Sequence, residues 1–487
     1  MFVKNAADLL AHGGRQGRAM ALDIIEHGLA AVDPYANVRR LVRVEGERLL
    51  VGGQPDMDVS GFGDEEIDLA GVRNVYVVGA GKAVLAMARA LEDILGERIS
   101  GGAITVKRGE AGQLRRIAVT EGAHPVPDEG SLAGTRRILE IAQTAGPDDL
   151  VFTLFSSGAS SLFVLPAPGF DLADVQAVYR LAIKYGHQTI IHRVMAYFSA
   201  VSCGRVVRTI WPARTVNFIL ALDRYERWRG RLHTGGSWIP SWPPGPRRLP
   251  EAARELRAEP WWEELPAGMR AALTRADPAY EVPDVDDFRA MPAGYWQPVD
   301  SHLMLAAAKR RAEELGLRGV ILGSWFWALG ATVMQVLAGV AKEAALYGNP
   351  AEPPVAIISG GELTVPVGNA TGVGGRNQEF ALGTVLRLGE QLSRKVVIAA
   401  VDSDGSDGPG TQLGGAGQIP FDCLAGGIVD DETLRQARVL GIDLAAELAN
   451  HNASVPLHRL HGGIYTGQTG ACAGDLRVVL VKERSNP

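Results

Sequence analysis

The chain has 487 residues, of which 46% are hydrophobic and 21% are charged. This balance is ordinary for a globular protein and excludes a mainly disordered chain, and the length allows two or more domains. Lys and Arg number 49 and Asp and Glu number 55, so the formal net charge is −6 at pH 7. No basic patch or arm stands out, so we expect no nucleic-acid partner. A local positive group can still bind a small anionic substrate.

The cysteines and the N-terminal residues indicate the cellular compartment in which the protein is expected. Cys203, Cys423 and Cys472 fit neither the spacing of a zinc site nor that of a disulfide framework. Cysteines of this kind are typical of a reducing compartment. Residues 1–29 lack the apolar core of a signal peptide and have the pattern of two amphipathic helices. We therefore expect a cytoplasmic protein.

Short β-branched runs that end in glycine-, serine- or aspartate-rich loops recur along the chain. These runs are Arg73–Gly79, Leu150–Phe155, Thr215–Leu222, Pro354–Ile358 and Lys395–Val401. Helical patterns, such as Val84–Leu95 and Ser131–Thr144, lie between them. The alternation predicts an α/β fold with largely parallel sheets. In such folds ligands bind at the carboxyl ends of the strands, which is where these loops lie.

The segment Pro240–Pro298 differs from its surroundings, since it holds eleven of the 27 prolines and few strand signals. We interpret it as a connector or lid, and we expect domains at residues 1–240 and 299–487 with the connector at 241–298. All nine tryptophans lie between Trp211 and Trp327. They either line a pocket for an apolar or sugar-like group or form a domain or subunit interface. The second alternative leaves a homodimer open.

The stretch from Gly319 to Ala341 contains no charged residue and is long enough to span a bilayer. Four glycines, Gln335 and the αβ pattern on both sides favour a buried strand followed by a core helix. We therefore expect no membrane association.

The first motif with a chemical function lies at Val77–Ala83. Gly79 and Gly81 form a Gly-x-Gly turn between a strand and a helix, but Val84 stands where a dinucleotide fingerprint has its third glycine. Lys82 follows the turn at the start of the helix. A lysine there can hold a phosphate or carboxylate together with the N–H groups of the turn. The alternative is a solvated surface lysine.

Two further motifs lie in the same half of the chain. His124 stands in the proline-rich string Glu121–Asp128 and is a candidate general base or a structural histidine in a rigid turn. The loop after the strand Leu150–Phe155 is rich in small residues whose N–H groups can cradle an anion. Its candidate contacts are Ser156, Ser157, Gly158 and Ser160.

The second half carries a Gly-Gly-Arg-Asn string and an acidic loop. Arg376 after Gly374 and Gly375 suits a phosphate or carboxylate, and Asn377 and Glu379 can hold a ribose, a metal or a water; the alternative is a tight turn with a helix cap. In the segment 402–408 three aspartates follow a strand without EF-hand spacing. Such a loop can bind Mg²⁺ together with nucleotide phosphates, and we expect Asp404 and Asp407 to be the ligands. The alternative is an Asp-rich turn without a ligand.

Together the strings VVGAGKA, EGAHPVPDEG, SGGE, GVGGRNQEFAL, DSDGSDGP and TGQTGACAGDLRVVLV resemble the glycerate 2-kinase (MOFRL) family over nearly the whole chain. The resemblance implies two α/β domains, an N-terminal Rossmann-like one and a smaller C-terminal one, with the site in the cleft between them. It also implies transfer of the γ-phosphoryl group of ATP to the 2-hydroxyl of glycerate, with Mg²⁺. Lys82 matches the catalytic lysine, Arg376 the arginine of its loop, and Asp404 and Asp407 the acidic loop. The string SGGE adds Gly360, Gly361 and Glu362 to the expected cofactor contacts.

The departures from the family pattern are concentrated in the N-terminal half. A run that has Arg, Lys, His and a second Lys in the family carries Met195, Ala196, Tyr197 and Ser202 here, leaving His192 and Arg193 as substitutes. Of an acidic loop in the family only Asp223 is matched, and we take it as a second candidate base. The segment 410–421 has the pattern of an insertion. Each lost charged contact weakens anion binding by ~1.5–3 kcal/mol, so we expect an acceptor other than glycerate.

The sequence supports a kinase that uses ATP and Mg²⁺ to phosphorylate a hydroxyl of a small hydroxy acid or polyol-like substrate. One alternative is a relative without kinase activity that binds a nucleotide or a sugar-like ligand. The other is a hydroxypyruvate reductase with a nicotinamide cofactor, which the incomplete glycine fingerprint disfavours.

Overall fold

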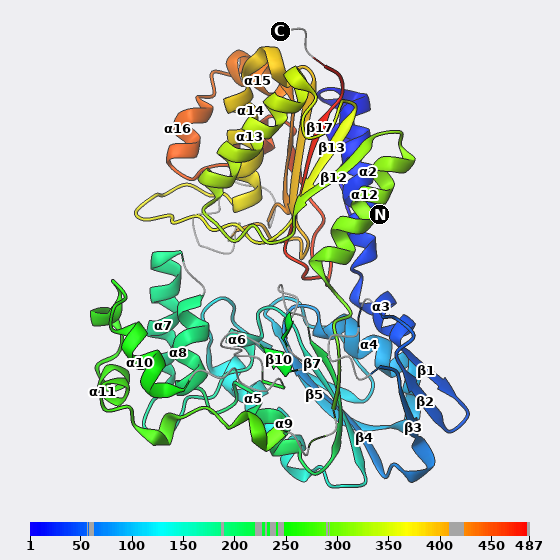
Figure 1. Cartoon of the computed structure of the whole chain (residues 1–487), viewed down its shortest axis with the longest axis vertical. Coiled ribbons are helices and arrows are strands. Elements are labelled where there is room, and N and C mark those ends of the chain that lie inside the picture. Colours follow the sequence, from blue (N-terminus) through cyan, green and yellow to red (C-terminus); the bar gives the residue numbers. More distant parts are fainter. Residues whose placement is uncertain are drawn as a thin grey trace. The chain divides into compact units, whose positions relative to one another are not determined.

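The computed structural model describes residues 1–55, 57, 63–186, 189–219, 226–228, 231–233, 240–241, 248–288, 291, 293–408 and 423–484. These residues belong to two compact units. The central unit comprises Pro34–Val299, and the terminal unit combines Met1–Asp33 with Asp300–Pro487. Each unit has its own six-stranded sheet (Figure 1).

The central unit is an α/β unit. Its α-helices are α3 (Pro34–Leu41), α4 (Val84–Leu95), α5 (Glu129–Thr144), α6 (Ala159–Leu162), α7 (Leu172–Tyr185), α8 (Thr189–Phe198), α9 (Arg205–Ile210), α10 (Leu249–Leu256) and α11 (Ala267–Arg275). Its strands are β1 (Val42–Glu45), β2 (Arg48–Val51), β3 (Glu65–Asp68), β4 (Asn74–Ala80), β5 (Ile99–Lys107), β6 (Ile117–Gly122), β7 (Asp149–Phe155), β8 (Arg214–Ile219), β9 (Glu226–Trp228), β10 (Arg231–His233) and β11 (Ala293–Trp296). The short 3₁₀ turns are η1 (Leu69–Gly71), η2 (Gly96–Arg98), η3 (Trp262–Glu264), η4 (Pro278–Tyr280) and η5 (Val285–Phe288).

The main sheet of the central unit has the order β11-β8-β7-β4-β5-β6, and every neighbouring pair is parallel. This confirms the predicted parallel α/β fold. Side chains alternate between the two faces of a strand. Val78 and Ala80 of β4 therefore point to one face, where they pack against Ile138 of α5 and Val206 of α9. All the strands run in one direction, so the loops that follow them emerge at one edge of the sheet.

The helices α7, α8, α10 and α11 share an apolar core in the central unit. This core takes in the described part of the segment interpreted as a connector or lid, because α10 and α11 carry buried residues such as Leu249 and Met269. Trp261 belongs to it as well, and Trp296 is fully buried beneath Phe218. These two tryptophans are core residues. The nine tryptophans are also divided between units, since Trp325 and Trp327 belong to the terminal unit.

The terminal unit is built from both ends of the chain. Its α-helices are α1 (Ala6–Ala11), α2 (Arg15–Ala31), α12 (Ser301–Glu314), α13 (Gly330–Tyr347), α14 (Arg376–Ser393), α15 (Asp431–Val439), α16 (Leu444–Ala449) and α17 (Ser454–Arg459). Its strands are β12 (Arg318–Gly323), β13 (Val355–Ser359), β14 (Val396–Asp402), β15 (Gly426–Val429), β16 (Gly463–Ile464) and β17 (Asp475–Val481).

The sheet of the terminal unit departs from the predicted parallel arrangement. Its order is β12-β13-β17-β14-β15-β16, and only β12 and β13 pair in parallel. The reason is that the last strand of the chain, β17, inserts between β13 and β14 and runs opposite to both. The carboxyl ends of β13 and β14 still meet at one edge, where β17 begins. Polar residues that follow β13 and β14 are therefore neighbours of Asp475.

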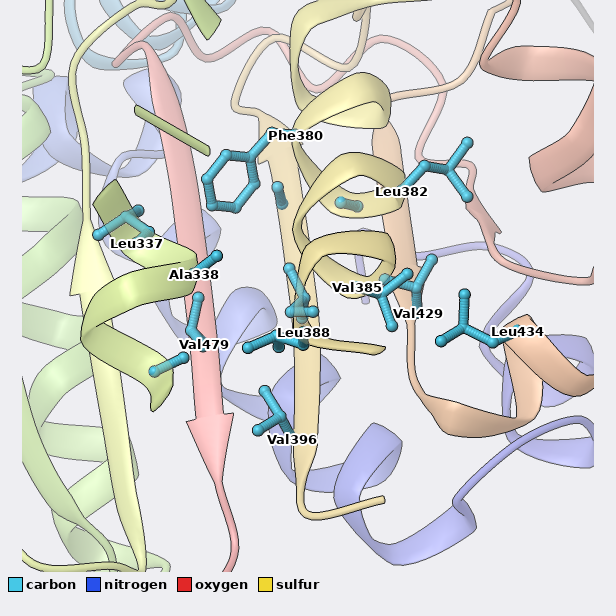
Figure 2. Packing of buried hydrophobic residues seen from close by; sticks show 14 of the residues in the cluster. Leu337, Ala338, Phe380, Leu382, Val385, Leu388, Val396, Val429, Leu434 and Val479 are labelled. Atoms are coloured by element: carbon cyan, nitrogen blue, oxygen red, sulfur yellow. The ribbon is translucent and has the colours of Figure 1, made fainter. Parts of the chain in front are cut away.

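Helices cover both faces of this sheet. On one side lie α13, α14, α15 and α16, and on the other lie α2 and α12 (Figure 1). Figure 2 shows the core between α14 and the strands, in which Val385 and Leu388 of α14 face Val396 and Val429. The burial of this apolar surface is the main favourable term in the folding of the unit.

The N-terminal segment corrects one expected boundary. We expected residues 1–240 to form one domain, but Met1–Asp33 belong to the terminal unit. Two glycines of α2 explain this placement, because they let the helix approach the sheet closely. A methyl group on Gly17 would lie 2.7 Å from Val397, and one on Gly28 would lie 2.5 Å from Leu476. The N-terminal segment therefore completes the fold of the C-terminal part of the chain.

The uncharged stretch 319–341 forms β12 and the first two-thirds of α13. No helix in the described part of the chain is both long and apolar enough to cross a membrane. The expected strand and helix are thus confirmed, but the strand lies at the edge of the sheet and is only half-buried.

Candidate active site

Three candidate motifs of the central unit meet at the carboxyl edge of its parallel sheet. The turn with Lys82 follows β4, the string with His124 follows β6, and the loop that begins with Ser156 follows β7. The strands β4 and β7 are direct neighbours, whereas β6 lies at the sheet edge beyond β5. The parallel order therefore brings together residues that lie up to about 80 positions apart in the sequence.

Backbone hydrogen bonds join the Lys82 turn to the serine loop. The N–H of Lys82 donates to the carbonyl oxygen of Ser157 (3.0 Å), and the N–H of Ala83 donates to Oγ of Ser156 (3.0 Å). The N–H of Gly81 donates to the carbonyl of Thr105 (3.1 Å). We expected the N–H groups of this turn to bind an anion together with Lys82. In the structure these three N–H groups instead fix the turn, so anion binding by the side chain of Lys82 stays a prediction.

The glycines of the turn allow this close packing of loops. Gly81 has a φ of +134°, and a methyl group there would lie 2.0 Å from Oγ of Ser156. A methyl group on Gly79 would lie 2.1 Å from the carbonyl oxygen of Leu154. Gly79 thus lets β4 lie close to β7, and Gly81 lets the turn lie against Ser156, while their role as cofactor contacts stays a prediction.

Gly158 is the point at which the three motifs converge. It has a φ of +84°, and a methyl group on its Cα would lie 3.2 Å from Cδ2 of His124 and 3.3 Å from Cγ of Lys82. The histidine ring and the lysine stem therefore both pack next to the Cα of Gly158. This places the stem of a lysine and a candidate general base side by side at the sheet edge.

The His124 string is itself held in place. Oδ1 of Asp128 accepts hydrogen bonds from the N–H of Ala123 (3.0 Å) and from the N–H of Ser131 (3.0 Å), where it caps α5. The hydroxyl of Tyr179 donates to the carbonyl of Ser160 and steadies the end of the serine loop. Asp223, the second candidate base, lies outside the described residues, as does the expected insertion at 410–421.

Helix α8, where we expected a departure from the basic run of the family, is largely apolar and buried. Met195, Ala196 and Tyr197 of α8 belong to the core shared with α7, α10 and α11. The two predicted substitutes, His192 and Arg193, do not present a free positive charge. Burial lowers the pKa of His192 to about 3, so its imidazole is neutral near pH 7. Arg193 forms ion pairs with Glu255 and Glu259, which neutralise its charge.

The terminal unit holds a second cluster, centred on Arg376 at the start of α14. Its Nε donates to Asp475 (2.9 Å), its Nη2 donates to Asp402 (2.6 Å), and Glu362 lies 3.7 Å away. Asp475 is fully buried and Asp402 nearly so. Burial opposes the charge of Arg376, but these carboxylates raise its pKa well above the ordinary value. The guanidinium expected to bind a phosphate is therefore already paired inside the protein.

Asp407 caps the same helix from a neighbouring loop. Its carboxylate accepts from the N–H of Asn377 (3.0 and 3.1 Å), from the N–H of Gln378 (2.9 Å) and from Nδ2 of Asn377 (3.1 Å). The residue is fully buried, and burial raises its pKa to about 6. Gly375 permits this approach, since a methyl group there would lie 2.0 Å from the carbonyl of Asp407. These contacts give Asp407 a structural role, and its role as a metal ligand stays a prediction.

The other candidates of the terminal unit lie near this cluster. Oδ1 of Asp404 accepts from the N–H of Ser406 (2.7 Å), and Glu379 lies 2.9 Å from Nδ1 of His451. Gly360 and Gly361 pack against neighbouring chain, with Gly361 at a φ of +97° beside the backbone of Phe326. A methyl group on Gly374 would lie 2.8 Å from the carbonyl of His451. In the described ranges the acidic loop does not form a group of three closely spaced metal ligands.

Sequence reasoning missed Asp475 and Arg477. Asp475 accepts from Arg376, from Nδ2 of Asn377 (2.7 Å) and from Arg477 (2.7 Å), and is thus the central acceptor of the cluster. Arg477 is fully buried and also donates to the carbonyl of Gly360. The available signal was an Asp-x-Arg pattern at the start of an otherwise apolar strand. Buried charges of this kind require partners.

Comparisons with known proteins agree with this architecture. The sequence pattern of a domain of unknown function, DUF4147, matches residues 20–221, and that of the MOFRL family matches residues 355–475. The chain is 29% identical to the glycerate 2-kinase of Pyrococcus horikoshii, over 96% of this chain and 98% of that protein. It is 32% identical to a putative hydroxypyruvate reductase of Agrobacterium vitis, over 83% and 86%. The crystal structure of glycerate kinase from Thermotoga maritima matches with a TM-score of 0.71 at 26% identity, over 95% and 99%.

Proposed function

The chain belongs to the glycerate 2-kinase (MOFRL) family, and from that premise we propose that it is a phosphotransferase acting on a hydroxyl of a small hydroxy acid. In the proposed reaction the acceptor hydroxyl oxygen forms a bond to the γ-phosphorus of ATP. The bond from that phosphorus to the β,γ-bridging oxygen breaks, and ADP leaves. The hydroxyl proton passes to a base of the protein.

The observation that carries this proposal is the convergence of Lys82, His124 and Gly158 at the carboxyl edge of the parallel sheet. Phosphoryl transfer needs positive charge near the transferring group and a group that accepts the hydroxyl proton. We assign the first role to the ammonium group of Lys82. The second falls to His124, with Asp223 as the alternative base. The glycine at position 158 lets the ring of His124 and the stem of Lys82 pack against the loop from Ser156 to Ser160.

The terminal unit offers oxygen ligands that suit Mg²⁺. Mg²⁺ binds carboxylates together with phosphate oxygens, and the start of α14 gathers several carboxylates. Oδ1 of Asn377 is buried there without a hydrogen-bond partner, so it is a further oxygen available to a ligand. We propose Asp404 as the best-supported metal ligand, since Asp407 is committed to capping α14. When bound, the ion would neutralise charge on the nucleotide phosphates.

We also propose that the acceptor is less acidic or more apolar than glycerate. The support is α8, which carries Met195, Ala196 and Tyr197 in an apolar core where the family has a basic run. Neither the neutral His192 nor the paired Arg193 replaces the lost charge. Without these cations the binding of a small carboxylate weakens, because each charged hydrogen bond contributes ~1.5–3 kcal/mol.

The test is ADP release from Mg·ATP with D-glycerate and then with a panel of larger hydroxy acids and polyols. We expect turnover with one of the larger acceptors at a kcat/KM above that for D-glycerate. Highest turnover with D-glycerate would refute the altered specificity but not the kinase. A protein that binds ATP without turning over any acceptor would support the non-kinase alternative.

A reductase is the second candidate, because a relative at 32% identity is named a putative hydroxypyruvate reductase. Its readout is separate, namely oxidation of NADH or NADPH with hydroxypyruvate. We expect no oxidation above the rate without protein, because the glycine turn before Lys82 has Val84 in place of the third glycine of a dinucleotide fingerprint.

A further inference from the structure

Three side chains of the terminal unit meet away from the cluster at α14. Nδ1 of His461 lies 3.0 and 3.2 Å from the carboxylate oxygens of Asp8. Nδ1 of His12 lies 3.5 Å from Oδ1 of Asp8 and 3.0 Å from its carbonyl oxygen. The two imidazole rings are stacked, with centroids 3.7 Å apart and planes 7° apart. In the described part of the chain, these three residues form the one group of at least three His, Cys, Asp or Glu side chains whose ligand atoms all lie within 4.8 Å.

The donor set identifies the class of ligand. Two imidazole nitrogens and one carboxylate oxygen are ligands of Zn²⁺ and similar divalent ions, whereas Mg²⁺ and Ca²⁺ prefer oxygen alone. With zinc bonds of about 2.0–2.2 Å, two ligand atoms of a tetrahedral site lie ~3.4 Å apart. The observed separations of 3.0 and 3.5 Å from Oδ1 of Asp8 lie on either side of that value. Because the two rings are stacked in nearly parallel planes, one imidazole must turn out of the stack before both Nδ1 atoms can bind a common ion, and the exposure of all three side chains permits that rotation.

A buried arginine holds the backbone that carries these ligands. Nη1 of Arg18 donates to the carbonyl of Leu9, next to Asp8, at 3.1 Å and to the carbonyl of His461 at 2.9 Å. Its Nε and Nη2 pair with Asp430, and both side chains are almost fully buried. One guanidinium thus joins two segments about 450 positions apart in the sequence. Groups placed in this way by a fixed support bind a metal with less loss of freedom.

The backbone next to the cluster is also specialised. Gly13, directly after His12, has a φ of +89°, and a methyl group there would lie 2.3 Å from Nε of Arg18. His461 has a φ of +50°, which is uncommon for a residue other than glycine. The contacts with Arg18 therefore fix the backbone of His461 and of Leu9, next to Asp8.

We propose that Asp8, His12 and His461 bind a divalent transition-metal ion of the Zn²⁺ type, with water in the remaining coordination positions. The ion would link the end of α1 to the loop before β16 and so fix the N-terminal segment on the terminal unit. This site is independent of the proposed phosphoryl transfer.

The experiment uses the full chain without a histidine tag, freed of metal by a chelator, in the absence of nucleotide. Isothermal titration with Zn²⁺ is compared between the wild type and His12→Ala. We expect Zn²⁺ binding in the wild type and an affinity at least tenfold weaker in the variant. His27→Ala is the matched control, because His27 lies 3.0 Å from Asp23 four residues earlier and has a similar exposure. It should leave the affinity unchanged.

A second variant and a second measurement distinguish loss of Zn²⁺ binding from a folding defect. His461→Asn keeps a residue that tolerates the left-handed backbone and should also weaken Zn²⁺ binding at least tenfold. At the same Zn²⁺ concentration, the unfolding temperature should rise more in the wild type and in His27→Ala than in the other two variants. Equal Zn²⁺ affinity in the wild type and His12→Ala, or no saturable binding to the wild type, would overturn the proposal. In that case the histidines only form hydrogen bonds with Asp8.

Discussion

Replacing Gly158 by alanine tests the convergence of the three motifs of the central unit. The new methyl group would lie 3.2 Å from His124 and 3.3 Å from Lys82, which is tighter than ordinary van der Waals contact. One or both side chains must therefore move by a few tenths of an ångström. Because a displacement of 1 Å costs about 100-fold in rate, we expect kcat/KM for phosphoryl transfer to fall by about tenfold.

The same substitution also strains the backbone, and a second glycine separates the two effects. An alanine with positive φ costs about 1–2 kcal/mol, of which ~0.4–1 kcal/mol is offset because alanine restricts the unfolded chain. Gly109 has a φ of +85°, close to the +84° of Gly158, and no atom lies within 4 Å of a methyl group placed there. Gly109→Ala should therefore lose about 1 kcal/mol of stability, like Gly158→Ala, but keep its activity.

The assay measures ADP release with the best acceptor and the urea midpoint of unfolding for both variants. The expected result is a similar shift of the midpoint in both and a loss of activity in Gly158→Ala alone. Equal losses of activity in the two variants, or full activity in Gly158→Ala, would refute the placement of Lys82 and His124 beside Gly158 in the working protein.

Two further predictions concern the cluster at the start of α14. Arg376→Met removes the cation between the buried Asp402 and Asp475 and should lower the free energy of unfolding by about 3–5 kcal/mol, whereas Arg48→Met, at an exposed ion pair, should hardly move the urea midpoint. Equal effects of the two would contradict the buried network. Burial raises the pKa of Asp407 from 3.8 to about 6, so the folded state binds a proton that the unfolded state has released. Stability from this group is present below pH 4 and falls by about 3 kcal/mol as the pH rises to 6. Between pH 4 and 7 the urea midpoint of Asp407→Asn should therefore fall less than that of the wild type. The same pH profile in both proteins would contradict the raised pKa of Asp407.

Patterns within single segments predicted the local structure well. The strand Leu150–Phe155 lies within β7, and the helix Val84–Leu95 is α4. The placement of Lys82 and of the serine loop at one sheet edge also follows from sequence, because parallel strands expose their carboxyl ends together. The hydrophobic periodicity and the turn residues suffice to predict these features, because residues close together in the sequence determine them.

Long-range pairing escaped the sequence analysis. The pattern of β17 gives no indication that this strand inserts between β13 and β14, and without that position Asp475 has no visible connection to Arg376. Likewise, the amphipathic pattern of α2 shows that the helix packs but not on which sheet. Local sequence shows the charge of Arg376 and of Asp407 but not the buried groups around them, which are carboxylates beside Arg376 and backbone N–H groups beside Asp407.

The proposed activity is phosphoryl transfer that depends on Lys82. The most direct test follows γ-labelled ATP, with Mg²⁺ and the acceptor panel, in the wild type, Lys82→Met and Lys184→Met. Lys184 lies in the same unit, is exposed and pairs with Glu264, so it is a matched control. We predict label in a phosphorylated acceptor with the wild type and Lys184→Met and a loss of at least 100-fold in Lys82→Met. Transfer by Lys82→Met at the wild-type rate, or no transfer by the wild type to any acceptor, would contradict the account.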